Sequence, residues 1–450
     1  MTLWGVPALR LAELVRTGKA SPLEVVRAHL DRIAAVDPVL RTFQALRAEG
    51  AEQDAKALGA RLDLPELPLA GVPVTVKDNV DVAGLPTRLG SRATSEQPAA
   101  ADDELVRRLR AAGCVVLGKA TMPELAIWAH TESALAGVTR NPWRLELTPG
   151  GSSGGAAAAV AAGMASLALA SDGGGSIRIP SAMCGVFGLK PGPAAVPLPG
   201  GAVEHWYGLS AFGPIATSVQ DAAAFLDVLT EPGAPATALE QPRTRLRIAA
   251  STQSPLRGVG ARAELRQAVE ATGRLLAEAG HLVDPADPPY PISLGLHWTR
   301  NWLAGIASDA APLPLDRLEP VTRRMHALGN RLGPDRHTAR RWRDAMVRWF
   351  GGRDLLLMPV IARRLPAAGW LRRGFAATYI RQSRAAPFTQ AWNLAGLPAA
   401  SVPAGLDSEA LPLSVQLVGP PGSERRLLEV AFEIETARPW PRLAPLRGSR

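Results

Sequence analysis

The chain has 450 residues, of which 47% are apolar, 20% charged and 5% aromatic. This composition is typical of a globular protein. The two cysteines, Cys114 and Cys184, exclude a disulfide scaffold, and neither lies in a spacing that binds structural zinc or an iron–sulfur cluster. No export signal is recognisable, and no stretch approaches the roughly 20 apolar residues of a transmembrane helix. We therefore expect a cytoplasmic protein without a membrane span.

The net charge of +9 arises from 45 arginines and five lysines set against 41 acidic residues. Residues 321–384 hold 15 of the arginines but only three acidic residues. A basic segment of this kind attracts nucleic acid or an anionic surface, although arginine-rich helices are more commonly solvent-exposed faces. We adopt the second interpretation and expect no nucleic-acid partner.

The N-terminal part predicts a helical arm followed by a strand. Residues 21–24 read Ser-Pro-Leu-Glu, which is a capping box with proline at the first helical position. Apolar residues then recur at helical spacing. Residues 71–80 are rich in β-branched side chains and predict a buried strand that ends in charged residues.

A repeated order of helix, glycine and strand follows. A helix is predicted over 103–112, with Gly113 as its C-cap and an apolar strand over 114–117. The same order returns over 264–283. Strands alternating with helices predict an α/β fold with helices packed around a central sheet. Further short strands are predicted at 166–170, 246–250, 354–358, 399–402 and 414–418.

Two segments depart from this alternation. The proline-containing residues 232–243 predict a surface connection. Residues 311–375 are rich in Arg and Trp, and we interpret them as a helical insertion or cap outside the sheet. Within that segment, residues 337–350 place apolar side chains at helical spacing opposite arginines. This pattern favours core packing over a role at a membrane surface or as a substrate lid.

Two loops rich in glycine and serine carry the candidate chemistry. Residues 148–155 read Thr-Pro-Gly-Gly-Ser-Ser-Gly-Gly and run directly into an alanine-rich helix former, which is not typical of a flexible linker. No nucleotide phosphate-loop pattern follows. Further along, three glycines precede Ser176. They leave backbone N–H groups accessible to a carbonyl oxygen while the serine attacks its carbon, although a plain tight turn has the same composition.

A serine nucleophile needs a base. None of the seven histidines lies in a pattern with an aspartate that indicates a triad. Lys77 is the alternative, because it ends an apolar strand and burial lowers the pKa of a lysine by disfavouring its charged form. The same position also suits a lysine that pairs with Asp78 or extends to the surface.

These segments resemble the three motifs of the amidase signature family: residues 71–79 with Lys77, 149–155 with Ser152 and 172–180 with Ser176. The motifs occur in the family's order, and the resemblance spans nearly the whole chain. Flanking segments that also match are 140–143, 184–191, 212–219, 393–398 and 413–419.

The resemblance implies a role for each matching residue. Ser176 would attack the carbonyl, Ser152 would relay the proton in a cis-peptide conformation, and Lys77 would be the base that later helps to protonate the leaving amine. No metal or cofactor is required. The oxyanion would be held by the backbone N–H groups of Gly173, Gly174, Gly175 and Ser176. The neighbours expected to support the loops by hydrogen bonds or an ion pair are Ser153, Asp172 and Arg178.

Departures from the family pattern concern the substrate. Gly173 stands where the family has a larger residue, so we expect an enlarged acyl site that tolerates bulkier or carbonate-like carbonyls. An apolar or aryl substrate is consistent with Trp298, Trp302 and Trp370, although core packing explains them equally well. By the resemblance, the candidate pocket residues are Trp128, Ala129 and His130.

The resemblance therefore implies a single amidase-type α/β domain over 1–450 with a central mixed sheet surrounded by helices. It implies an amidohydrolase that cleaves the C–N bond of a small apolar or aryl carboxamide through a serine acyl-enzyme. We expect a monomer or homodimer with a small-molecule amide, carbamate or ester as its partner. The expected parts are the N-terminal arm (1–62), the catalytic core (63–235), the insertion or cap (311–375) and the C-terminal part of the core (376–450).

Two alternatives remain open. Carbamate (urethane) or ester hydrolysis is the first, because one acyl-enzyme route serves any carbonyl with a suitable leaving group. The second is the glutamine-hydrolysing subunit of a tRNA-dependent amidotransferase. The Arg-rich segment favours RNA contact, but residues 311–375 do not resemble the corresponding region of that subunit.

Overall fold

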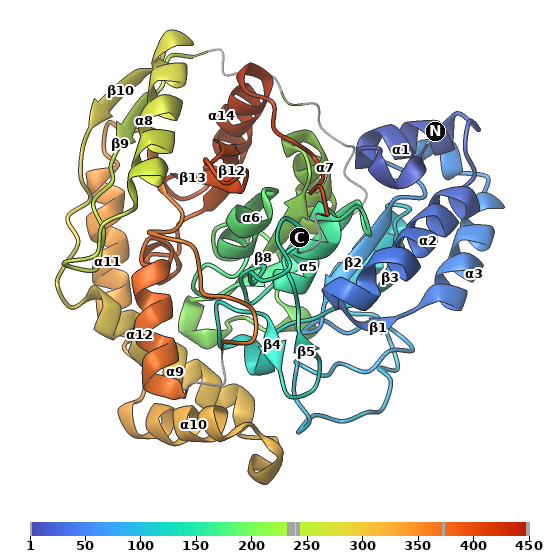
Figure 1. Cartoon of the computed structure of the whole chain (residues 1–450), viewed down its shortest axis with the longest axis horizontal. Coiled ribbons are helices and arrows are strands. Elements are labelled where there is room, and N and C mark those ends of the chain that lie inside the picture. The colour runs from blue at the N-terminus through green and yellow to red at the C-terminus, as the bar shows by residue number, and fades with distance from the viewer. Residues whose placement is uncertain (1, 232–238, 240–243, 371–373, 447–450) are drawn as a thin grey trace.

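The computed structural model describes residues 2–231, 239, 244–370 and 374–446. The connection predicted at 232–243 therefore lies, apart from Leu239, outside the described residues. Within them, eleven strands form one sheet in the order β1-β3-β2-β6-β8-β7-β12-β13-β11-β9-β10 (Figure 1). In chain order the strands are β1 (Phe43–Leu46), β2 (Pro73–Lys77), β3 (Val115–Ala120), β6 (Leu167–Asp172), β7 (Phe187–Lys190), β8 (Ala211–Ala216), β9 (Arg247–Ala250), β10 (Leu282–Pro285), β11 (Leu355–Pro359), β12 (Ala399–Leu406) and β13 (Pro412–Val418).

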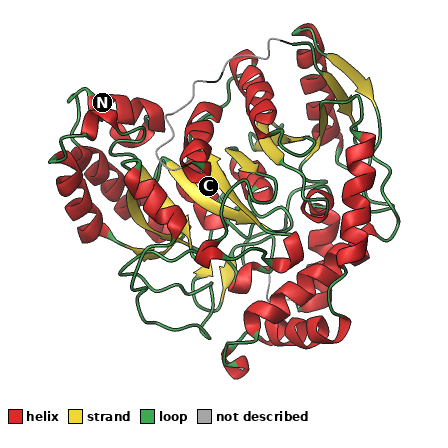
Figure 2. Ribbon diagram, turned by 180° about the vertical axis from the view of Figure 1, so that it is seen from behind, coloured by secondary structure: helices red, strands yellow, loops and turns green. Residues whose placement is uncertain are grey.

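The sheet mixes parallel and antiparallel pairs. Strand β2 runs parallel to β3 and β6, and β9 runs parallel to β10 and β11. The strands between these two parallel groups pair antiparallel. Helices surround the strands when the molecule is viewed from behind (Figure 2). The predicted single α/β domain with a central mixed sheet is therefore confirmed. A separate short hairpin joins β4 (Glu132–Ser133) to β5 (Gly137–Val138).

The repeated order of helix, glycine and strand is present at both predicted places. Helix α4 (Glu104–Ala111) leads into β3, and α8 (Ala263–Glu278) leads into β10. Gly113 and Gly280 make these turns with φ of +93° and +103°, a region that glycine adopts without steric cost. At Gly113 a Cβ would also lie 3.0 Å from the Cα of Ala70.

The N-terminal arm consists of α1 (Ala8–Arg16), α2 (Pro22–Leu40) and α3 (Ala48–Gly59). The predicted capping box starts α2. The backbone N–H of Ser21 donates to Glu24 Oε2 at 2.7 Å, and the backbone N–H of Glu24 donates to Ser21 Oγ at 3.2 Å. Helices α2 and α3 contact β3 and so cover one end of the sheet.

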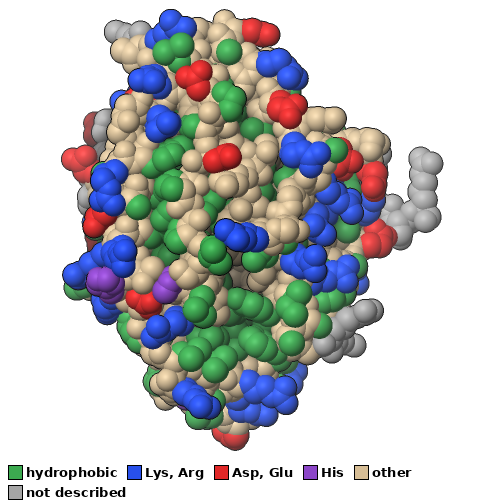
Figure 3. Space-filling model, turned by 90° about the vertical axis from the view of Figure 1, so that its left-hand side faces the viewer, with side chains coloured by type: hydrophobic (Ala, Val, Ile, Leu, Met, Phe, Trp, Pro, Cys, Tyr) green, Lys and Arg blue, Asp and Glu red, His purple; other side chains and the backbone are tan. Residues whose placement is uncertain are grey.

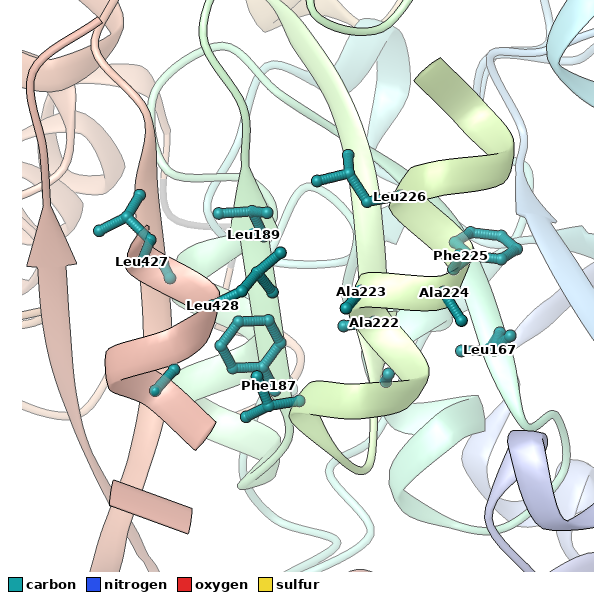
Figure 4. Close-up of a cluster of buried hydrophobic side chains, with 14 of the residues drawn as sticks. Leu167, Phe187, Leu189, Ala222, Ala223, Ala224, Phe225, Leu226, Leu427 and Leu428 are labelled. Atoms are coloured by element: carbon teal, nitrogen blue, oxygen red, sulfur yellow. The ribbon is translucent and has the colours of Figure 1, made fainter. Parts of the chain in front are cut away.

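The core lies on both faces of the central strands. Helices α7 (Val219–Thr230) and α14 (Glu424–Ala437) cover one face, where Phe187 lies beside Leu428 (Figure 4). Alternate residues of a strand point to opposite faces. Leu167 and Leu169 of β6 belong to this cluster, whereas Ala168 and Ala170 pack with α5 (Gly154–Ala161) on the other face.

The segment expected as an insertion, 311–375, is helical only in part. Helices α10 (Pro320–Leu332) and α11 (Arg336–Trp349) follow α9 (Leu294–Ala310), but β11 also falls within the segment and pairs with β9 and β13 inside the main sheet. The fully buried apolar run 355–358 explains this placement. Trp342 and Met346 of α11 are buried in the core, as predicted. Among the described residues, no helix is both long and apolar enough to span a membrane.

Candidate active site

The three motif loops meet at one edge of the central sheet. Lys77 ends β2 and Asp172 ends β6, and these strands are parallel neighbours, so their C-terminal ends lie at the same edge. Ser176 follows β6 in the turn before α6 (Arg178–Cys184). Ser152 lies two residues before α5. The fold thus brings together side chains from three separate parts of the sequence.

Lys77 is fully buried and bonded to serines. Its Nζ donates to Ser152 Oγ at 2.7 Å and to Ser171 Oγ at 2.8 Å. Asn79 Nδ2 also donates to Ser171 Oγ, at 3.0 Å. Burial lowers the pKa of Lys77 to about 7, while the negative charge of Asp172 opposes that shift. The lysine can therefore exchange a proton near neutral pH.

The loop around Ser152 is anchored on both sides. The Gly151–Ser152 peptide bond is cis. A Cβ at Gly151 would lie 2.7 Å from the carbonyl oxygen of His130, so the loop passes too close to this backbone for a larger residue. The N–H of Ser153 donates to the carbonyl oxygen of Ser176 at 3.2 Å, and Ser153 Oγ donates to that of Ser171 at 3.1 Å. Ser153 thus ties the two serine-bearing loops together.

A buried ion pair holds the loop of Ser176. Arg178 Nε lies 2.9 Å from Asp172 Oδ2, and both side chains are inaccessible to solvent. Arg178 also donates to Asn393 Oδ1 at 2.6 Å and to Gln416 Oε1 at 2.7 Å. Burial on its own would raise the pKa of Asp172, but the charge and hydrogen bonds of Arg178 outweigh it and hold that pKa well below its usual range. The carboxylate therefore stays charged.

The N–H groups of the loop differ in what they bind. The N–H of Gly175 donates to Asp172 Oδ1 at 2.6 Å. We expected this N–H group to be part of the oxyanion hole. It is instead bonded to the carboxylate that braces the loop. Within the described residues we find no partner for the N–H groups of Gly173, Gly174 and Ser176. These three N–H groups can therefore donate to a further acceptor.

The glycines before Ser176 make room for tryptophan rings. A Cβ at Gly173 would lie 2.7 Å from Trp206 Cε3, and one at Gly174 would lie 2.5 Å from Trp298 Cζ2. Trp298 Nε1 also donates to the carbonyl oxygen of Gly173 at 3.2 Å. The expectation that Gly173 enlarges the acyl site is therefore wrong, because the indole of Trp206 fills the space beside it.

Two cavities meet at Ser176. The larger, about 360 Å³, is lined by Ser152, Ser171 and Ser176. Its lining also includes apolar side chains: Leu89, Met122, Leu125, Leu198 and Phe212. The smaller, about 50 Å³, is lined by four tryptophans: Trp128, Trp206, Trp298 and Trp302. The rings of Trp298 and Trp302 are stacked with centroids 5.2 Å apart.

The candidate pocket residues differ in where they lie. Trp128 and Ala129 line the smaller cavity. His130 is fully buried behind it, where its Nδ1 pairs with Gln382 Nε2 at 2.8 Å and its ring stacks on Trp370 at 6.4 Å. Burial, followed by the positive charge of Arg381, lowers the pKa of His130 to about 3. A neutral His130 therefore supports the pocket wall from behind.

A third cavity extends from the smaller one toward the surface. It measures about 470 Å³ and shares Trp298, Tyr379, Ser383 and Gln390 with the smaller cavity. Its other lining includes the exposed apolar side chains Leu256, Ile292, Leu296 and Ile380. On the side of the molecule that carries α9 and α12 (Phe375–Ala385), hydrophobic side chains gather around a hollow (Figure 3).

Sequence reasoning missed several residues of this site. Ser171 precedes Asp172 at the end of an apolar strand, so its polar side chain there was a usable signal. Trp206 begins a short 3₁₀ helix (Trp206–Gly208) in a segment for which the sequence predicts no element. Arg178 donates hydrogen bonds to three residues that lie 211 to 238 positions further along the chain: Thr389, Asn393 and Gln416. No local sequence signal links Arg178 to these partners.

Comparisons with known proteins identify the family of this chain. The family model described as Amidase matches residues 24–428. "Putative amidase AmiB2" of Mycobacterium bovis is 44% identical over 453 residues, covering 96% of each chain. The solved structure of 6-aminohexanoate cyclic dimer hydrolase complexed with substrate superposes with a TM-score of 0.87 at 31% identity, covering 99% of this chain and 100% of that one. A bacterial aryl acylamidase of the amidase signature family superposes with a TM-score of 0.85 at 26% identity and 97% coverage of both chains.

The chain therefore belongs to the amidase family, with its mixed α/β sheet and its matches along nearly the full length. It is an amide-hydrolysing enzyme.

Proposed function

We propose that the enzyme hydrolyses a small apolar or aryl amide through Ser176 as nucleophile, Ser152 as proton relay and Lys77 as base. The contact between the buried Lys77 Nζ and Ser152 Oγ carries this proposal. Ser152 and Ser176 line the same cavity, so a substrate carbonyl can reach the nucleophile while the relay remains bonded to the lysine. The cis Gly151–Ser152 bond is consistent with the role that the amidase resemblance implies for Ser152.

Acylation proceeds in two proton-coupled steps. Ser176 Oγ attacks the carbonyl carbon and passes its proton to Ser152 Oγ, while the hydroxyl proton of Ser152 moves to the neutral amine of Lys77. The N–H groups of Gly173, Gly174 and Ser176 stabilise the oxyanion. The C–N bond then breaks as Ser152 donates a proton to the leaving nitrogen and recovers one from Lys77. Water attacks the acyl-enzyme by the same route and releases the carboxylic acid.

The cavities support an apolar substrate. Leucine, methionine and phenylalanine side chains line the larger cavity, and four indoles line the smaller one. The third cavity adds an apolar approach to the smaller one. Two structural neighbours are named for acting on a cyclic dimer of 6-aminohexanoate and on aryl acylamides, and both names support amide chemistry here.

A hydrolysis panel tests the proposal. Purified enzyme is assayed on an aliphatic amide, an anilide, an ester, a carbamate and glutamine, together with Ser176→Ala and Lys77→Ala. The exposed Ser408 and Lys56 provide matched controls as Ser408→Ala and Lys56→Ala. We expect anilide or aliphatic amide turnover that both site variants lose and both controls keep. Turnover confined to the ester or the carbamate would move the proposal to that substrate class. Amide turnover that survives in Lys77→Ala would exclude the triad.

A further inference from the structure

The lining of the larger cavity at Ser176 includes a second group of polar side chains. They are His205, Ser210, Ser308 and Asp309. Asp309 is the only residue with a formal charge among the described residues that line this cavity. Outside it, Arg336 is paired with Glu204 at 2.6 Å, which neutralises that basic group. Among the described residues that line this cavity, a substrate therefore meets one carboxylate and no lysine or arginine.

Asp309 belongs to an ordered hydrogen-bonded cluster. Trp206 Nε1 donates to its Oδ2 at 2.7 Å, and His205 Nε2 lies 3.2 Å from its Oδ1. Ser210 Oγ lies 2.7 Å from His205 Nδ1. These contacts suit the tautomer in which the Ser210 hydroxyl donates to Nδ1 and the Nε2–H donates to Asp309. Each carboxylate oxygen then holds one donor and can accept a second. The side chain of Asp309 remains 25% exposed.

The indole of Trp206 fixes the distance between Asp309 and the nucleophile loop. Its benzene edge lies against Gly173, and its pyrrole edge lies against Gly305, where a Cβ would be 2.5 Å from Cγ. Trp206 has a φ of +50°, which is uncommon for a bulky residue, so its position depends on these contacts. Because its N–H binds Asp309, the carboxylate lies one indole width from the loop that carries Ser176.

The cavity with Asp309 is also the one that receives the leaving amine. The proton for the departing nitrogen comes from Ser152, and Ser152 lines this cavity but not the smaller one. A group attached to that nitrogen can reach Asp309, because Ser152, Ser176 and Asp309 line the same cavity. A carboxylate in a confined site is stabilised by a cation that donates hydrogen bonds to it.

We propose that Asp309 is a subsite for an ammonium group carried by the leaving amine, so that the enzyme prefers N-acyl derivatives of diamines. The inference rests on the proposed function and names its substrate class. Water adds to the acyl carbon and the C–N bond breaks. An N-acyl diamine with one ammonium group thus yields a carboxylate and a doubly protonated diamine, and the charge balances.

The test compares two isosteric substrates, N-(4-aminobutyl)benzamide and N-pentylbenzamide, in which an ammonium group replaces a methyl group. We expect kcat/KM of the wild-type enzyme to favour the ammonium substrate about ten- to hundredfold, as for a hydrogen bond between charged groups. Asp309→Asn keeps an acceptor for Trp206 and should reduce this ratio at least about tenfold. Asp31→Asn, which removes an exposed carboxylate on α2, should leave the ratio unchanged.

A wild-type preference for the pentyl substrate would overturn the subsite without any variant. An unchanged ratio in folded Asp309→Asn would do the same. A preference found only for 5-aminopentananilide over hexananilide would place the ammonium on the acyl side and contradict the assignment of the cavity. If the enzyme hydrolyses neither benzamide nor any amide of the hydrolysis panel, the proposed function fails. Calorimetric binding of N-(4-aminobutyl)benzamide to Ser176→Ala, lost in Ser176→Ala/Asp309→Asn, would then still support the subsite, and equal binding would refute it.

Discussion

Trp206 occupies the volume that a side chain at Gly173 would need, because its Cε3 lies 2.7 Å from the position of the missing Cβ. The space beside the loop of Ser176 is therefore filled by a separate segment of the chain. The ring that takes the place of a side chain at Gly173 also binds Asp309 through its N–H. The consequences can be tested at both residues.

Gly173→Ala should lower kcat/KM by at least about tenfold, because a contact this short forces the ring or the loop to move. Adding Trp206→Leu should partly restore the rate in the double variant, since the smaller side chain vacates the contested space. Gly260→Ala is the matched control, as a Cβ there meets nothing within 4 Å. Additive losses in the double variant would show that the two residues do not compete for space.

The rate should depend on pH through Lys77. Burial lowers its pKa to about 7, and in the proposed mechanism the neutral amine is the base. We therefore expect kcat/KM to rise as pH increases through about 7 and to level off above it. Lys77→Arg should be inactive at every pH, because a guanidinium does not release its proton in this range. A rate that falls between pH 6 and 8 would contradict the assignment of Lys77 as a base.

Ser171 is expected to be a positioning residue for Lys77. It accepts from Nζ at 2.8 Å and from Asn79 at 3.0 Å. Ser171→Ala should lower kcat about ten- to hundredfold, with a smaller effect on KM. It should also move the midpoint of the pH profile downward, because the charged amine loses an acceptor. Ser171→Thr keeps the hydroxyl and should recover most of the rate. An unchanged midpoint in Ser171→Ala would reduce the residue to a structural role.

The buried Asp172–Arg178 pair should dominate local stability. Arg178→Ala leaves a buried carboxylate without its cation, so we expect the free energy of unfolding in urea to fall by about 3–5 kcal/mol. Arg61→Ala is the comparison, because the Arg61–Asp63 pair is exposed and should change little. If Arg178→Ala and Arg61→Ala lost the same unfolding free energy, burial would not explain the contribution of the Asp172–Arg178 pair to stability.

Much of the fold was predictable because its signals are local. The capping box of α2, the glycine turns at 113 and 280 and the apolar strands each occupy a short stretch of sequence. The candidate site was predictable in so far as the three motifs carry its serines and lysine. The bracing of Arg178 by Asn393 and Gln416 was not predictable, because only the folded chain brings them together. The contact between Trp206 and Gly173 was not predictable for the same reason. Without it, the sequence led to the wrong expectation that Gly173 enlarges the acyl site.

The long-range bracing of Arg178 also sets when activity can arise during synthesis. Its partners Asn393 and Gln416 follow it by 215 and 238 residues. A nascent chain in which Lys77, Ser152 and Ser176 have already left the ribosome still lacks the side chains that hold Arg178. We therefore expect a chain that ends before Asn393 to lack hydrolase activity.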